Sequence, residues 1–204
     1  MGIEAHFTRH AMAERQVVLV FISTLLFAAA QAEGGNTEDG QEVDIRKFLQ
    51  ENQKIIVYQA TDGGNKTCVA DYYSDVKNTE AVFERYYTDG ARRSSFLLRG
   101  VFGSTKEGPE ARPTKMSVFF SRTGTDGTLF SQETMLYFSS AGNCGVFNVT
   151  DYTGESWLDV RIKYGSVNLE HKFCLKFYSD ILGKATSRRV YEEGCPPVTS
   201  NSNQ

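Results

Sequence analysis

The chain has 204 residues, of which 40% are hydrophobic and 23% charged, and its formal net charge is −3. Because there is no excess of basic residues, neither nucleic acid nor an anionic membrane surface is expected as a partner. The 172 residues that follow the leader described next are enough for one domain with a sizeable core and too few for two comfortable ones.

The first segment has the layout of a secretion signal. Residues 17–30 are almost wholly apolar, with Arg15 before them and the small-x-small stretch Ala30-Gln31-Ala32 after them. This pattern predicts a signal peptide over residues 1–32, cut before Glu33, and hence a secreted, extracellular protein. A membrane anchor needs about 20 apolar residues, so it is the minor alternative. Met1 and Met12 both remain possible initiators.

The elements then follow in chain order. Residues 33–43 are polar, acidic and glycine-rich and predict a flexible lead-in. Asp44 is placed to cap a short helix whose apolar residues recur at helical spacing. Turn residues then separate eight β-rich segments: 54–61, 68–76, 82–88, 94–104, 115–123, 128–140, 144–152 and 156–166.

The periodicity changes after the last of these segments. Phe173, Phe177 and Ile181 are spaced four apart within residues 169–182, with Cys174 and Tyr178 beside them, which predicts a helix with an apolar stripe. A polar tail follows at residues 198–204. The folded domain is therefore expected at residues 44–197.

Eight sequential antiparallel strands must form either two packed sheets or a closed barrel. An all-β, eight-stranded up-and-down barrel removes the exposed strand edges and has room for one small ligand. A β-sandwich fits the same strand pattern and is the alternative. The strand count and the helix that follows favour the barrel.

The four cysteines predict two disulfides, because thiols rarely persist unpaired in an exported chain. Cys144 and Cys174 lie 30 residues apart, inside an outer pair, Cys68 and Cys195. Four cysteines allow three connectivities, and the sequence does not select one. The nested pairing would hold the end of the chain against an early strand of the barrel.

Two sequons are consistent with export. Asn65-Lys66-Thr67 follows a predicted turn, and Asn148-Val149-Thr150 lies within a predicted strand. We expect a glycan on Asn65, while modification of Asn148 requires that its side chain face outward.

Several segments occur in a distinctive order: residues 143–147 (NCGVF), residues 157–163 (WLDVRIK), Cys174 and residues 190–195 (VYEEGC), with residues 56–58 (IVY) ten residues ahead of Cys68. Together they resemble the salivary lipocalins of ticks, the group that includes the histamine-binding proteins. The resemblance covers about residues 44–195. The resemblance rests on the order of these segments along the chain and on the spacing of the cysteines, since no single motif is highly specific.

The resemblance implies a secreted barrel that sequesters a mediator of the host and has the nested disulfides Cys68–Cys195 and Cys144–Cys174. Histamine and serotonin are the amine ligands of such proteins, while other members bind leukotrienes, fatty acids or host proteins such as complement factors. The chain departs from the family at one point. Histamine binders carry Asp-x-Trp-Lys in the opening helix, whereas here Arg46 stands in place of the tryptophan.

An amine site needs a carboxylate for charge pairing and aromatic faces for cation–π contact. Alternation along the strands places Glu133 on one face with Met135 and Tyr137, and Asp159 on one face with Trp157. Each acid could instead lie on a solvated outer face, and Asp44 could serve only as a helix cap. The candidate ligand-binding residues are Asp44, Tyr58, Glu133, Tyr137, Trp157 and Asp159.

Catalysis is not expected. His171 is the only histidine after the leader, and the chain lacks the G-x-S-x-G, H-E-x-x-H and P-loop motifs. One histidine and disulfide-bonded cysteines cannot build a tetrahedral zinc site, so we expect neither a metal nor a cofactor. His171 is interpreted as a surface helix residue.

Two function classes remain. The first is a monomeric scavenger of a small host mediator, an amine or a lipid, which works by capture without turnover. The second is a barrel that serves as a scaffold and binds a host protein through loops such as residues 104–114. The fold does not decide between the two classes.

Overall fold

The structure is a computed structural model that describes residues 42–50, 53–108, 111–121, 127–139 and 141–197. The described residues belong to the compact unit Asp39–Gln204. The predicted signal peptide, most of the predicted lead-in and the polar tail lie outside the described residues.

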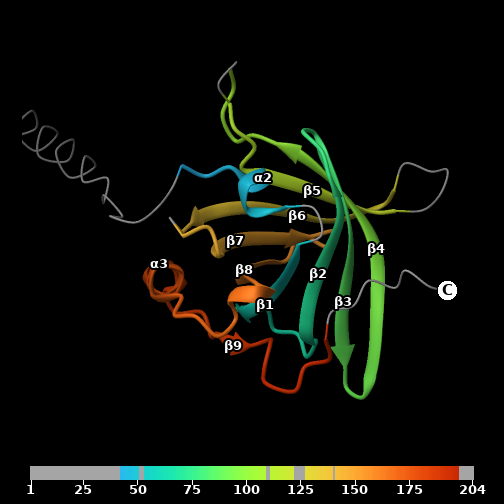
Figure 1. Cartoon of the computed structure of the whole chain (residues 1–204), viewed down its shortest axis with the longest axis vertical. Helices are drawn as coiled ribbons and strands as arrows, with labels where there is room; N and C mark the ends of the chain where they lie inside the picture. Colours follow the sequence, from blue (N-terminus) through green and yellow to red (C-terminus); the bar gives the residue numbers. More distant parts are fainter. Residues whose placement is uncertain (1–41, 51–52, 109–110, 122–126, 140, 198–204) are drawn as a thin grey trace, which may run out of the picture. The chain divides into compact units, whose positions relative to one another are not determined.

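Eight antiparallel strands close into a barrel (Figure 1). Each strand pairs with the next in sequence, and β1 pairs with both β8 and β2, which closes the sheet. The predicted barrel is confirmed, and the sandwich alternative is wrong. The strands are β1 Lys54–Ala60, β2 Thr67–Val76, β3 Glu80–Asp89, β4 Arg92–Gly103, β5 Lys115–Phe120, β6 Leu129–Phe138, β7 Cys144–Asp151 and β8 Ser156–Lys163.

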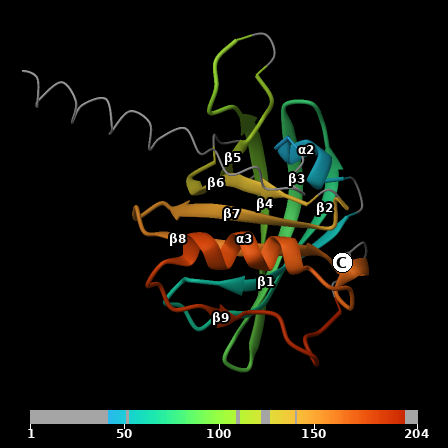
Figure 2. The same ribbon diagram turned by 90° about the vertical axis from the view of Figure 1, so that its left-hand side faces the viewer.

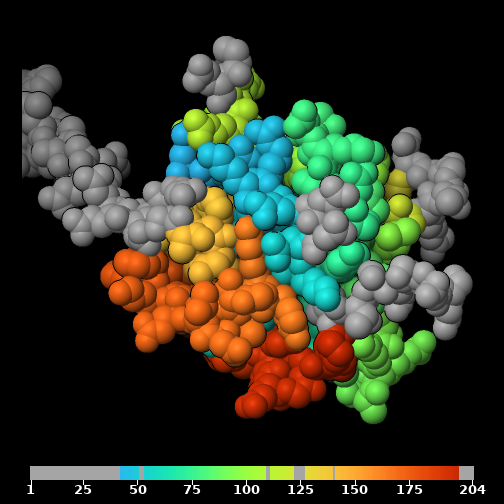
Figure 3. Space-filling view, viewed as in Figure 1, coloured from blue at the N-terminus to red at the C-terminus, as the bar shows by residue number. Residues whose placement is uncertain are grey.

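The short helix α2 (Ile45–Phe48) closes one end of the barrel. The Asp44 side chain caps it by accepting a hydrogen bond from the Arg46 backbone N–H at 3.0 Å, as the sequence predicts. Ile45, Phe48 and Leu49 are buried in the barrel core, where the Phe48 ring contacts the Phe147 ring at 5.6 Å between centroids. In the space-filling view, α2 (blue) lies between the green β2–β3 surface and the golden β6–β7 surface (Figure 3).

The second helix, α3 (Lys172–Leu182), packs against the outside of the barrel across β7 and β8 (Figure 2). Cys174 and Tyr178 form its buried side, while Phe173 and Ile181 are exposed. The predicted apolar stripe is confirmed in part: Cys174, Tyr178 and the partly buried Phe177 pack against the barrel, whereas Phe173 and Ile181 do not. The Cys144–Cys174 disulfide explains the difference, because it fixes the rotation of the helix with Cys174 facing β7.

The nested disulfides are confirmed: Cys68 is bonded to Cys195 and Cys144 to Cys174. The chain between β8 and α3 contains the 3-10 helix η2 (Tyr164–Ser166), and after α3 the two-residue strand β9 (Arg188–Arg189) pairs with β1. The Cys68–Cys195 bond then attaches the end of the described chain to the start of β2.

The expectation that His171 is a surface residue is wrong. His171 is buried at the N-cap of α3, and its Nε2 atom lies 2.8 Å from the Ser166 carbonyl oxygen of η2. It lies outside the barrel wall.

Candidate functional site

Five charged side chains form a continuous chain of ion pairs across the barrel interior. They are Asp71, Arg85, Glu133, Asp159 and Arg161, which we call the ionic belt. All five are buried, and Glu133 has no exposed surface. They come from β2, β3, β6 and β8. Buried charges in such a chain must be paired to be tolerated, and each carboxylate here has at least one guanidinium partner.

Glu133 is the centre of the belt because it bridges both arginines. On one side, Arg85 donates from Nη1 to the Glu133 Oε1 atom at 2.9 Å and from Nε and Nη2 to the two oxygens of Asp71 at 2.7 Å each. On the other side, Arg161 donates from Nη1 to the Glu133 Oε2 atom. Ser131 donates from Oγ to Glu133 Oε1 at 3.1 Å. The bidentate geometry makes these strong, directional contacts.

Asp159 accepts at both of its oxygens. Arg161 donates from Nε and Nη2 to Oδ2 at 3.2 and 2.9 Å, and the Trp157 indole N–H donates to Oδ1 at 2.9 Å. A carboxylate has about four acceptor positions in total. Counting donors from the described residues, one acceptor position is left on Oδ1, the oxygen that faces Trp157.

The belt contains three carboxylates and two guanidinium groups, so it has one excess negative charge when all are ionised. Burial alone would raise the pKa of Glu133, but Arg161 and Arg85 outweigh it and lower the pKa to about 2. Burial raises the pKa of Asp159 above its ordinary value, even though Arg161 favours the charged form. The charge of Asp159 is therefore less well compensated than that of Glu133.

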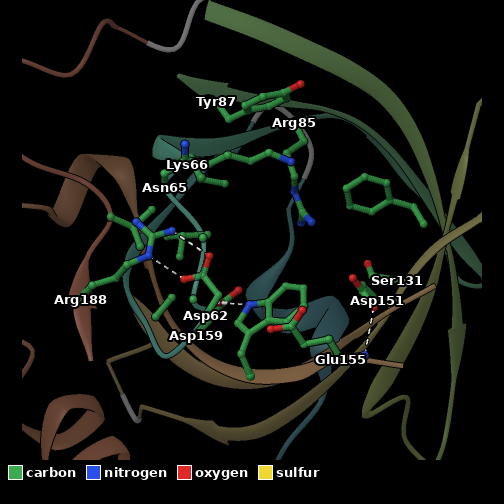
Figure 4. A pocket seen from close by; sticks show the side chains of 18 of the residues that line it. Asp62, Asn65, Lys66, Arg85, Tyr87, Ser131, Asp151, Glu155, Asp159 and Arg188 are labelled. Atoms are coloured by element: carbon green, nitrogen blue, oxygen red, sulfur yellow. Dashed lines mark hydrogen bonds and ion pairs between the residues drawn. The ribbon is translucent and has the colours of Figure 1, made fainter. Parts of the chain in front are cut away.

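A cavity of about 350 Å³ lies between the belt and the barrel end opposite α2. Asp159, Arg85 and Ser131 form its inner surface (Figure 4). Its walls are mostly apolar, and the apolar side chains are Val57, Ala60, Val69, Tyr87, Phe96, Phe130, Trp157 and Val190. The volume lies within the range of known small-molecule pockets.

Polar residues surround the mouth of the cavity. They come from the loop between β1 and β2, from β9 and from the turn before β8. Arg188 donates from Nε and Nη2 to the two oxygens of Asp62, each at 2.8 Å. The Lys66 ammonium group lies 4.7 Å from the centre of the Tyr87 ring. Glu155 directs its carboxylate into the cavity (Figure 4), and it forms no ion pair with any other described residue.

Three of the predicted ligand-binding residues meet at one place. Arg161 joins Glu133 to Asp159, Trp157 donates to Asp159, and both Asp159 and Trp157 line the cavity directly. The alternative that Asp159 and Arg161 lie on a solvated outer face is wrong, since both are buried in the barrel interior.

The other three predicted residues lie elsewhere. The expectation that Tyr137 shares a face with Glu133 is wrong, because a β-bulge after Met135 turns Tyr137 outward, where its ring stacks on Phe177 of α3 at 4.8 Å. Tyr58 is also on the outer face, with the Arg189 guanidinium 3.5 Å from its ring centre.

Asp44 lies at the closed end, away from the cavity. Its carboxylate pairs with Arg46, the residue that replaces the family's tryptophan, at 3.0 Å. Burial raises its pKa, but the hydrogen bonds and charge of Arg46 prevail and the net shift is downward. Its charge is thus already compensated within the helix that it caps.

Sequence reasoning missed Asp71 and Arg85 as functional candidates. Both face inward at alternate positions, Asp71 between Val69 and Tyr73 and Arg85 between Phe83 and Tyr87. A charged residue flanked at i−2 and i+2 by large apolar residues was the available signal. Among the residues that the structure describes, no cluster could hold a metal ion, and no helix is long and apolar enough to cross a membrane.

Comparison with known proteins identifies the fold only. No protein-family model matches the chain, and no curated protein matches it. A solved structure of AM182 in complex with serotonin is similar, with a TM-score of 0.55 and 15% identity over 78% of this chain and 97% of that one. At this identity the likeness shows a shared lipocalin fold.

Japanin from Rhipicephalus appendiculatus, solved bound to cholesterol, is also similar. Its TM-score is 0.47 and its identity is 11%, over 71% of this chain and 96% of that one. At this lower similarity it adds nothing to the assignment of the fold.

Proposed function

We propose that this chain is a secreted, monomeric scavenger that captures one small amine of a host, such as histamine or serotonin, in the cavity above the ionic belt. In this proposal it belongs to the salivary lipocalins of ticks and blunts a host defence response by stoichiometric capture. No turnover is required.

The observation that carries the proposal is the position of Asp159. It is buried, it lines the cavity, and it belongs to a belt with one more carboxylate than guanidinium groups. A bound ammonium group would balance the excess charge and donate to the open acceptor position on Oδ1. A buried carboxylate with a raised pKa gains stability from such a partner, because an unpaired buried charge is costly.

The cavity walls also suit an aromatic amine. Trp157 lies beside Asp159, so a cation paired with that carboxylate would be near an indole ring. The apolar walls provide contact for the flat part of the ligand. The similarity to a lipocalin solved with serotonin is consistent with this ligand class.

The direct test is calorimetric titration of the wild type and Asp159→Asn with histamine and with serotonin. The asparagine has nearly the shape of aspartate, keeps one acceptor oxygen for either the Trp157 indole or Arg161, and leaves the belt with equal numbers of carboxylates and guanidinium groups. We expect the variant to lose about 2 kcal/mol of amine affinity, a factor of about 30 in Kd. Urea unfolding would show that the variant is folded.

Asp44→Asn is the matched control. It removes a carboxylate at the closed end, and asparagine is an equally good N-cap. We expect unchanged amine affinity. A titration with leukotrienes and fatty acids completes the design: tight binding of anionic lipids alone, or amine binding that is indifferent to Asp159→Asn, would contradict the proposal. An empty barrel that binds only a host protein would favour the scaffold alternative.

A further inference from the structure

The sequon Asn65-Lys66-Thr67 lies at the mouth of the cavity. Asn65 is exposed in the loop between β1 and β2, and it is one of the residues that line the cavity (Figure 4). Its Nδ2 atom, the atom that an N-linked glycan modifies, donates to Asp89 Oδ1 at 3.2 Å. Thr67, the third sequon residue, is also exposed. The acceptor site is accessible and directly beside the opening.

A second hollow adjoins the same opening. It has a volume of about 400 Å³ and is lined by Tyr87, Asp89, Arg92, Ser94, Ser95 and Phe96. Tyr87 and Phe96 line the cavity as well, so the two spaces meet at these rings. The Asn65–Asp89 hydrogen bond joins a lining residue of one space to a lining residue of the other. A group attached to Nδ2 would therefore stand where the cavity opens to solvent.

The other sequon has a different environment. Asn148 is in the middle of β7, paired with Thr134 of β6 on one side and Leu158 of β8 on the other. Its neighbours Phe147 and Val149 are in the interior core, so Asn148 faces the outside of the barrel wall. It is not among the residues that line the cavity. A glycan there would not affect the mouth.

We propose that Asn65 carries an N-linked glycan that narrows the mouth and slows both entry and exit of the amine. The inference rests on the proposed function, because it assigns a gate to that same cavity. The modification requires a lipid-linked oligosaccharide diphosphate as donor. The sugar C1–O bond to the diphosphate breaks, a C1–N bond to Asn65 Nδ2 forms, Nδ2 loses one proton, and the lipid diphosphate leaves. The remaining N–H can keep its bond to Asp89.

The glycan should change rates and leave affinity nearly constant. It is attached at the mouth, whereas Asp159 and Trp157 hold the amine at the inner end of the cavity. An obstacle that does not contact the bound ligand raises the barrier equally in both directions, so its effect on the two rate constants cancels in Kd. The glycan should also restrict the entry of other solutes into the cavity. The chain has a single tryptophan, Trp157, and its fluorescence reports access to the cavity without any ligand.

The test uses the full chain, with its own leader, secreted from insect cells as wild type, Asn65→Gln, Thr67→Ala and Asn148→Gln. Glycopeptide mapping should find a glycan on Asn65 of the wild type. Acrylamide should quench Trp157 more strongly in Asn65→Gln and Thr67→Ala than in the wild type. Stopped-flow mixing with histamine should give association and dissociation rates several-fold higher in those two variants, with unchanged Kd. Asn148→Gln should match the wild type.

Thr67→Ala separates the glycan from the side chain, because it abolishes the sequon and keeps the Asn65–Asp89 hydrogen bond. An unmodified Asn65 in the wild type, or wild-type quenching in Thr67→Ala, would overturn the gate. If no variant binds histamine or serotonin but the quenching difference is present, the amine proposal fails and the glycan at the mouth stands.

Discussion

The two ends of the barrel interior are filled in opposite ways. At the closed end, α2 and its C-cap residue contribute Ile45, Phe48 and Leu49, which pack with the stacked rings of Tyr73 and Phe83 into an apolar core. At the other end, the rings that point inward are only partly buried and line the cavity. The interior of an eight-stranded barrel can either be filled by side chains or hold one small ligand. Here the side chains that α2 and Leu49 place inside one end fill it as core, and the other end is left as the cavity.

The ionic belt separates these two regions. Its arginines contact aromatic rings of the core, since the Arg161 guanidinium lies 4.5 Å from the centre of the Phe147 ring and Arg85 lies 5.4 Å from that of Phe83. On its other side, Asp159 faces the cavity. The belt thus forms the inner surface of the cavity on one side and borders the apolar core on the other. The following predictions test whether the two regions are as distinct as their contacts indicate.

The largest expected effect comes from removing an arginine of the belt. Arg161→Met leaves three buried carboxylates with one guanidinium group, and the loss of one partner from a buried ion pair costs about 3–5 kcal/mol. Urea unfolding at neutral pH would measure this loss. Arg99→Met is the control: the Arg99–Glu80 pair is partly exposed, and its removal should cost at most about 1 kcal/mol. Equal losses in the two variants would show that the belt is no more than a solvated network.

Truncating one ring at each end compares the two regions directly. Phe48→Ala should cost about 3 kcal/mol, the lower end of the usual range, because α2 can settle into part of the vacated space. Phe96→Ala should cost much less, since Phe96 is only partly buried and already borders open volume. Urea unfolding of both variants provides the comparison. If Phe96→Ala were the more damaging change, the cavity end would have to be reinterpreted as core.

The pH dependence of stability should separate the two carboxylates at the centre of the belt. The pKa of Glu133 is lowered from 4.5 to about 2, so its stabilisation is complete above pH 4.5 and is lost as the pH falls toward 2. The pKa of Asp159 is raised, so its contribution has the opposite sign: it favours the folded state at acid pH, and this is lost as the pH rises through its folded pKa.

Asp159→Asn removes the second contribution and keeps Glu133 with both of its arginine partners. The difference in the free energy of unfolding, variant minus wild type, should therefore be largest at pH 7. It should decrease as the pH falls toward 4. Urea unfolding at several pH values would measure the difference, which we expect to be smaller than the effects of the preceding substitutions. A constant difference across this range would mean that Asp159 titrates as it does in the unfolded chain.

The sequence predicted the wall of the barrel better than its interior. Strand positions, the cap at Asp44 and the number of disulfides follow from local patterns, because alternation and turn chemistry act over a few residues. The interior positions of Glu133, Trp157 and Asp159 were predicted because two-residue periodicity holds along β8 and the first part of β6. Tyr137 was misplaced because one inserted residue after Met135 reverses the faces of the strand.

The belt itself required information that local patterns do not contain. Arg85 and Glu133 are 48 residues apart in sequence, and their pairing depends on the barrel closing. The exact rotation of α3 likewise depends on the disulfide that joins Cys174 to β7, which leaves Phe173 and Ile181 of its apolar residues exposed. In both cases, contacts between distant segments decide which face of an element is buried.

The smallest expected effect concerns the boundary between belt and cavity, where the Trp157 indole N–H donates to Asp159. Trp157→Phe keeps an aromatic wall and removes this donor, so the ionised carboxylate loses one of its three stabilising hydrogen bonds. The pKa of Asp159 should rise further, and amine affinity should fall because proton and ammonium compete for the same oxygen. A net hydrogen-bond contribution of about 1 kcal/mol corresponds to a roughly fivefold weaker Kd. Calorimetric titration with serotonin at pH 7 and pH 5 would measure it, with the larger loss expected at pH 5. A loss that is equal at both values would place the role of Trp157 in ring contact with the ligand and not in holding the charge of Asp159.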